Sequence, residues 1–84
     1  MKESRVYRTI ITIEELGELT QALTKYLRYM FYDDSLRKDR YEIQDMIYEE
    51  LADVELCLEK FKKQMCISDE DLKIIKEAKE ERLR

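Results

Sequence analysis

Six acidic residues fall in two short segments of the chain, EELGEL at residues 14–19 and EELADV at residues 49–54. Residues three or four apart lie on one face of a helix, so Glu15 pairs with Glu18, and Glu50 pairs with Asp53. If two such helices pack together, four carboxylates meet. Because ionised carboxylates are costly to bury and repel one another, this arrangement favours a divalent cation between them. The sequence therefore predicts a metal site made by Glu15, Glu18, Glu50 and Asp53.

The alternative interpretation is a pair of solvent-exposed helix faces with modest ion pairs, which is the usual role of glutamates on helices. The position of Glu50 argues against it. At about 100° per residue, Glu50 projects within about 40° of the apolar residues Ile43, Val54 and Phe61, so packing should draw it inward. Like charges at Glu14 and Glu18, and at Glu49 and Asp53, also disfavour an isolated helix.

The chain has no histidine, and we interpret Cys57 and Cys66 as small hydrophobic residues in a reducing compartment. Oxygen ligands alone specify a hard cation, Mg²⁺ with Mn²⁺ as a substitute, and magnesium usually shares its shell with substrate phosphates. A polyphosphate is the expected substrate. Lys25 and the basic residues near the end of the chain could hold its phosphate oxygens.

Two tyrosines, Tyr26 and Tyr29, share a predicted helix face with Glu15. They could stack on the base or sugar of a ligand. Tyrosines at helical spacing are more often part of a core or a dimer interface, so both interpretations stay open.

The length and the composition limit the remaining choices. The 84 residues form one domain, 1–84, and a domain of this size buries only about 60% of its unfolded surface, so we expect a homodimer or homotetramer. The net charge of -4 offers no basic surface for a nucleic acid polymer. No segment has the roughly 18 to 20 apolar residues of a membrane span, and no signal peptide is apparent, so we expect a cytoplasmic protein without membrane contact.

With no proline and only Gly17, the sequence predicts an all-α fold of three helices, two long and antiparallel and one shorter, in a four-helix-bundle-type oligomer. The first helix should run from about Ser4 to Tyr32. The second should start within 36–41, after a cap at Asp34 or Ser35, and end near Met65. The third should begin at a Ser68 cap and continue to the basic residues Lys79, Arg82 and Arg84. The residues expected to face the core are Ile13, Leu16, Leu19, Thr20, Leu23, Leu27 and Met30, then Ile43, Ile47, Leu51, Val54, Leu58, Phe61 and Met65, then Leu72, Ile75 and Leu83.

Two local features carry further expectations. Thr12 and Glu15 have the spacing of a capping box, so a helix that begins at Ile13 competes with the longer first helix. Gly17 costs about 1 kcal/mol relative to alanine inside a helix, which suggests that another backbone approaches it closely.

The two acidic segments together resemble the motifs of the MazG-like all-α nucleoside triphosphate pyrophosphohydrolases: Glu-Glu-x-x-Glu, a spacer, then Glu-x-x-Asp. This resemblance spans nearly the whole chain. It implies helix-bundle dimers or dimers of dimers that use magnesium to cleave a nucleoside triphosphate between its α and β phosphates. It also implies Glu15, Glu18, Glu50 and Asp53 as metal ligands, Glu14 or Glu49 as an aid to the attacking water, and Lys76 and Arg82 as phosphate contacts.

Other functions remain open on the sequence alone. One is a catalytically inactive helical module whose acidic clusters contact a basic partner or store a metal. The other is a related pyrophosphohydrolase activity on phosphoribosyl-ATP or on a deoxynucleotide.

Overall fold

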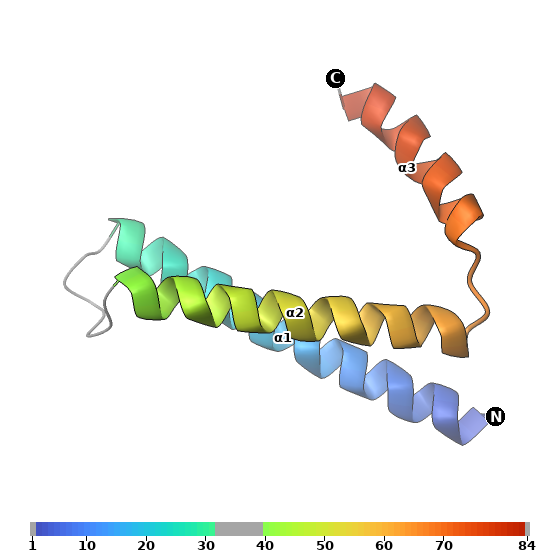
Figure 1. The fold of residues 1–84 in the computed structure, drawn as a ribbon, viewed down its shortest axis with the longest axis horizontal. Coiled ribbons are helices and arrows are strands. Elements are labelled where there is room, and N and C mark those ends of the chain that lie inside the picture. Colours follow the sequence, from blue (N-terminus) through green and yellow to red (C-terminus); the bar gives the residue numbers. More distant parts are fainter. Residues whose placement is uncertain (1, 32–39, 84) are drawn as a thin grey trace.

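The computed structural model describes residues 2–31 and 40–83, and these residues form three α-helices and no strand (Figure 1). The helices are α1 (Lys2–Phe31), α2 (Arg40–Gln64) and α3 (Asp69–Leu83). The prediction of three helices, two long and one short, is confirmed. Tyr32 and the predicted cap at Asp34 or Ser35 lie outside the described residues.

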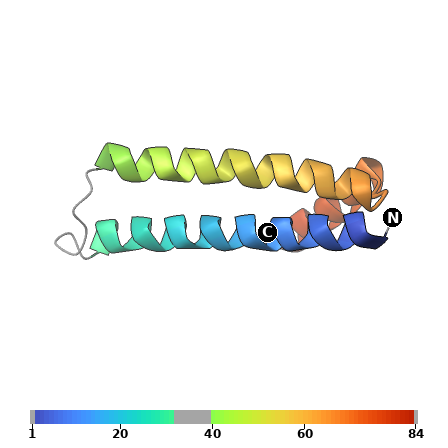
Figure 2. The ribbon, with the colours of Figure 1, turned by 90° about the horizontal axis from the view of Figure 1, so that it is seen from below.

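Helices α1 and α2 lie side by side and antiparallel, as both views of the ribbon show (Figures 1 and 2). The seam between them contains the few side chains that are buried among the described residues, which are Thr12, Ala22, Ile43, Val54 and Cys57. Burial of Ile43 and Val54 agrees with the sequence prediction for the second helix.

The predicted core face of the first helix is wrong for the single chain. Most of the stripe from Ile13 to Met30 is exposed, and Ile13 and Met30 keep 62% and 56% of their surface accessible. Instead, α1 packs on α2 through its second stripe, which contains Ile11, Glu15, Ala22 and Tyr29. On α2, Leu51 and Leu58 are also exposed rather than buried. An apolar pattern marks a surface to be covered, but it does not say by which neighbour.

The competing start of the first helix at Ile13 is also wrong. Helix α1 runs through Thr12, whose hydroxyl donates a 2.7 Å hydrogen bond to the backbone carbonyl of Arg8, one turn earlier. The hydroxyl therefore bonds to a carbonyl within the helix and does not cap a helix N-terminus.

A left-handed residue ends α2. Cys66 has a φ of 56°; its N–H donates to the carbonyl of Lys63, and the N–H of Ile67 donates to the carbonyl of Lys62, which is the Schellman pattern of helix termination. The predicted Ser68 cap is confirmed, because its Oγ accepts a 3.2 Å hydrogen bond from the N–H of Asp71.

Helix α3 departs from the hairpin and packs against neither α1 nor α2 within the described residues (Figure 1). A 2.8 Å ion pair from Lys62 Nζ to Asp69 Oδ1 connects the last turn of α2 to the first residue of α3. The radius of gyration is 16.4 Å, compared with about 12 Å for a compact domain of this length. The single chain is therefore open and extended.

The conformation of Cys66 gives a first prediction. Glycine adopts a positive φ without the steric cost of a β-carbon, so Cys66→Gly should raise the free energy of unfolding by about 1 kcal/mol. Urea unfolding followed by circular dichroism measures this, with Cys66→Ala as the control that removes the thiol and keeps the β-carbon. Equal stability of the two variants would contradict the steric explanation.

The expectation of a close backbone at Gly17 is wrong, since a β-carbon added there meets no atom within 4 Å. Gly17→Ala should therefore stabilise the protein by about 1 kcal/mol through helix propensity. Ala52 is the matched control, because Leu51-Ala52-Asp53 repeats the spacing of Leu16-Gly17-Glu18. Ala52→Gly should lower the unfolding free energy by a similar amount, and a loss of stability in Gly17→Ala would contradict the open environment.

Candidate metal centre

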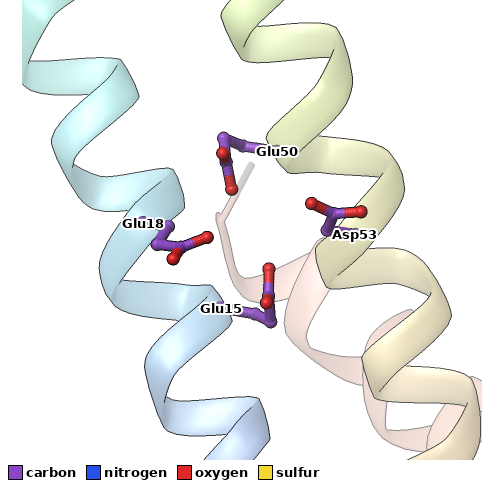
Figure 3. A group of neighbouring side chains, drawn as sticks. All are labelled: Glu15, Glu18, Glu50 and Asp53. Carbon is purple, nitrogen blue, oxygen red and sulfur yellow. The ribbon is translucent and has the colours of Figure 1, made fainter.

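Four carboxylates from two helices converge in the seam between α1 and α2 (Figure 3). Glu15 and Glu18 come from α1, and Glu50 and Asp53 come from α2. Each contributes one oxygen to a group whose members all lie within 4.8 Å of one another. These are the four residues that the sequence singled out as metal ligands.

The helical repeat and the antiparallel packing together place these groups. Within each helix the two acids are three residues apart and so lie on one face. Because α2 runs opposite to α1, the two pairs meet at the same height along the seam (Figure 3). Leu16 and Leu51 lie about 200° around their helices from Glu18 and Asp53, which directs each leucine to the opposite side of the hairpin.

The four side chains differ in their access to water. Glu18 and Asp53 are exposed, whereas Glu15 and Glu50 are half-buried. The Oε2 atoms of Glu15 and Glu50 are buried and have no hydrogen-bond partner. A buried polar atom without a partner destabilises the fold, so two of them on facing residues indicate that something else satisfies these oxygens.

The same environment raises the pKa of Glu15 and of Glu50. Loss of solvent is the main cause for each, followed by repulsion from Glu18 and Asp53. Both causes oppose the charged form. A positive charge placed between the carboxylates would reverse this preference.

Among the side chains that the structure describes, 4–31 and 40–83, none supplies such a positive charge, because no lysine or arginine there forms an ion pair with any of the four acids. A hard cation with ligands at about 2.1 Å separates opposite oxygens by about 4.2 Å, so the observed group needs only a small contraction to hold one. The oxygen-only ligand set fits Mg²⁺ or Mn²⁺.

The remaining acidic candidates lie beside this group. Glu14 and Glu49 are exposed neighbours of Glu15 and Glu50 and are not among the four converging carboxylates. Lys25 is half-buried and follows Glu18 by seven residues, which places it on the same side of α1 about 10 Å further along.

The tyrosines line a separate space. Tyr26 and Tyr29 border a cavity of about 660 Å³ between the second half of α1 and the first half of α2, and none of the four acids lines it. The two tyrosines and the four acids therefore do not line a common cavity. Sequence reasoning missed the other polar residues of this cavity, Arg40, Gln44 and Tyr48, although their four-residue spacing places them along one face of α2.

Lys76 and Arg82, the predicted phosphate contacts, are exposed on α3. Since α3 does not pack on the hairpin, the structure does not bring either residue to the acids of its own chain.

Comparison with known proteins identifies no relative: no family model, no curated protein and no solved structure matches the chain. Among the described helices, none has the length and apolar character needed to cross a membrane.

The raised pKa values predict how stability depends on pH without metal. A carboxyl with a raised folded-state pKa stabilises the fold while it is protonated, so the contribution of these two glutamates should be complete below the ordinary value of 4.5 and be lost as pH rises through the raised values. Glu50→Gln should flatten this fall and be the more stable protein at pH 7.5. Urea unfolding between pH 4.5 and 7.5 in the presence of a chelator measures both effects.

Glu55→Gln is the matched control, because it removes the same charge at an exposed position outside the group. Added Mn²⁺ should stabilise the wild type and Glu55→Gln at pH 7.5 and leave Glu50→Gln unchanged. Identical pH and metal responses in the two variants would show that Glu50 has no special environment.

Proposed function

We propose that this protein is a Mg²⁺-dependent nucleoside triphosphate pyrophosphohydrolase of the MazG-like kind. It would cleave a ribo- or deoxyribonucleoside triphosphate between the α and β phosphates and so remove unwanted nucleotides from the cytoplasmic pool. The supporting observation is the convergence of Glu15, Glu18, Glu50 and Asp53, with two buried carboxylate oxygens that lack partners.

The substrate class follows from the ligand chemistry. A site made only of carboxylates on one open seam leaves part of the shell of a hard cation to other oxygen ligands. Phosphate oxygens are the usual partners of Mg²⁺ in such sites. When bound, Mg²⁺ would neutralise phosphate charge and favour ionisation of a water molecule.

The residues of the chain divide the remaining tasks. Glu15, Glu18, Glu50 and Asp53 would hold the cation and thereby fix the phosphates against the seam. Glu14 or Glu49 would accept the proton of the water that attacks phosphorus, while the bond from the α-phosphorus to the bridging oxygen breaks and pyrophosphate leaves. Lys25, on the same side of α1 as Glu18, would neutralise the outer phosphates.

We also propose that the working form is a homodimer or homotetramer built as a four-helix bundle. The seam of a single hairpin buries few side chains, which suits a chain that completes its core by association. In such an assembly Lys76 and Arg82 would reach a substrate held by another chain, because α3 does not pack on its own hairpin.

Activity gives the next prediction. Purified protein with MgCl₂ and a panel of nucleoside triphosphates should release pyrophosphate and the monophosphate, and Glu50→Gln or Asp53→Asn should lower kcat/KM at least about a hundredfold. Glu55→Gln should keep wild-type activity.

The reaction products distinguish this activity from the alternative functions. Pyrophosphate from phosphoribosyl-ATP, or phosphate from a deoxynucleoside diphosphate, would identify the related activities. A folded, metal-loaded protein that turns over none of these substrates would refute the enzyme and favour a helical interaction or metal-binding module.

A further inference from the structure

The two acidic segments belong to a longer internal repeat. Residues 14–25 read EELGELTQALTK, and residues 49–60 read EELADVELCLEK. At a constant offset of 35 residues, five of the 12 positions carry the same residue, and Glu18 aligns with Asp53. Each stretch ends in a lysine, Lys25 in the first and Lys60 in the second. The match between the two helices therefore extends beyond the acids to a positive charge.

The structure places matched residues in matched environments. Glu15 and Glu50 are both half-buried, and each has a buried Oε2 atom without a hydrogen-bond partner. Ala22 and Cys57, which also align in the repeat, are both small buried residues of the seam. Because α1 and α2 are antiparallel, an approximate twofold axis through the four acids relates the two helices (Figure 3). A ligand bound at this axis meets similar groups in both directions along the seam.

The two lysines lie on the side of the hairpin that carries Glu18 and Asp53. Each lysine follows its acid by seven residues, which is two helical turns less about 20°, and so lies about 10 Å further along its own helix. Since the two helices run in opposite directions (Figure 2), Lys25 lies toward the end of α1 and Lys60 toward the end of α2. The acids are therefore placed between two positive charges.

Neither lysine has a carboxylate partner in its own helix. No acidic residue stands three or four positions from Lys25 or from Lys60, although the chain has 20 acidic residues. Among the side chains of residues 4–31 and 40–83, neither lysine forms an ion pair. A solvated lysine needs no partner, but the same placement in both halves of the repeat favours a shared role. The role that fits an unpaired ammonium group beside a cation site is to bind an anion.

A polyphosphate is an anion that can use both lysines together. A cation held by the four acids would bind the phosphate chain near its middle and leave one phosphate on each side. The lysine ammonium group is a common phosphate ligand, and its flexible stem lets it reach inward along the helix. A single phosphate can contact one of the two lysines at a time, whereas a chain of three phosphates has an end for each.

We propose that Lys60 is a phosphate-binding residue equivalent to Lys25, and that the two lysines hold opposite ends of one triphosphate chain laid across the acids. The choice of ligand rests on the proposed function. Because Lys25 is the contact proposed for the outer phosphates, Lys60 contacts the α-phosphate at the other end. The nucleoside then leaves the seam toward the end of α2.

Binding of inorganic triphosphate in saturating Mg²⁺, measured by isothermal titration calorimetry, tests this arrangement without turnover of a nucleotide. Lys25→Gln and Lys60→Gln should each weaken binding at least about tenfold, because each loses a charged hydrogen bond. Inorganic phosphate needs only one lysine and can use the other, so each variant should weaken its binding only about twofold.

Lys63→Gln is the matched control. It removes the same charge from an exposed position of α2 three residues later, and position 63 lies outside the repeat. This variant should bind inorganic triphosphate as the wild type does.

Three results would overturn the proposal. One is a wild-type protein that does not bind inorganic triphosphate in Mg²⁺. The second is a Lys60→Gln protein that binds it as tightly as the wild type. The third is equal weakening by Lys63→Gln, which would indicate a general effect of charge.

Nucleotide hydrolysis separates this proposal from the proposed function. If Lys60→Gln hydrolyses a nucleoside triphosphate with the KM of the wild type, the role of Lys60 is refuted and the pyrophosphohydrolase stands. If no nucleotide is hydrolysed but inorganic triphosphate binds through both lysines, the enzyme is refuted and the triphosphate site stands.

Discussion

Repulsion among four carboxylates in one helical seam is the constraint on which the rest of this structure depends. Glu15 and Glu50 face each other from half-buried positions, each with an oxygen that lacks a hydrogen-bond partner, and Glu18 and Asp53 close the group from the solvent side. Burial and mutual repulsion both raise the pKa of the two inner glutamates. Without a cation, these groups are either protonated in the folded protein or charged and mutually repulsive. The four carboxylates therefore lower the stability of the metal-free fold, and a doubly charged ion would remove this cost.

In both acidic segments a leucine comes two residues before the last acid, as Leu16 before Glu18 and Leu51 before Asp53. In both motifs a leucine lies about 200° from the outermost acid, so one register directs acids to one side of the hairpin and leucines to the other. The site and the apolar surface are therefore consequences of the same sequence pattern. The same pattern that places acids in the seam therefore leaves apolar side chains such as Leu16 and Leu51 exposed on the opposite side of the hairpin.

Much of the site follows from local rules. Spacing within Glu15–Glu18 and Glu50–Asp53, and the place of Glu50 in an apolar stripe, are sufficient to predict the four-residue group, and Ser68 is recognisable as a cap because its hydroxyl serves the N–H of Asp71. The sequence pattern predicts less well which surfaces pack against each other. The stripe from Ile13 to Met30 is apolar whether α2 or another chain covers it, so the pattern could not name its neighbour. No neighbouring atom requires a glycine at position 17 in the single chain. Tyr26 and Tyr29 line a different cavity from the acids, because they lie further along α1.

Crystals grown with Mn²⁺ and measured at a wavelength where manganese scatters anomalously test the central claim most directly. The account predicts one strong anomalous peak in the α1–α2 seam, within about 2.0 to 2.3 Å of oxygens from Glu15, Glu18, Glu50 and Asp53. A seam without a peak at saturating Mn²⁺, with the four side chains turned apart into solvent, would contradict it.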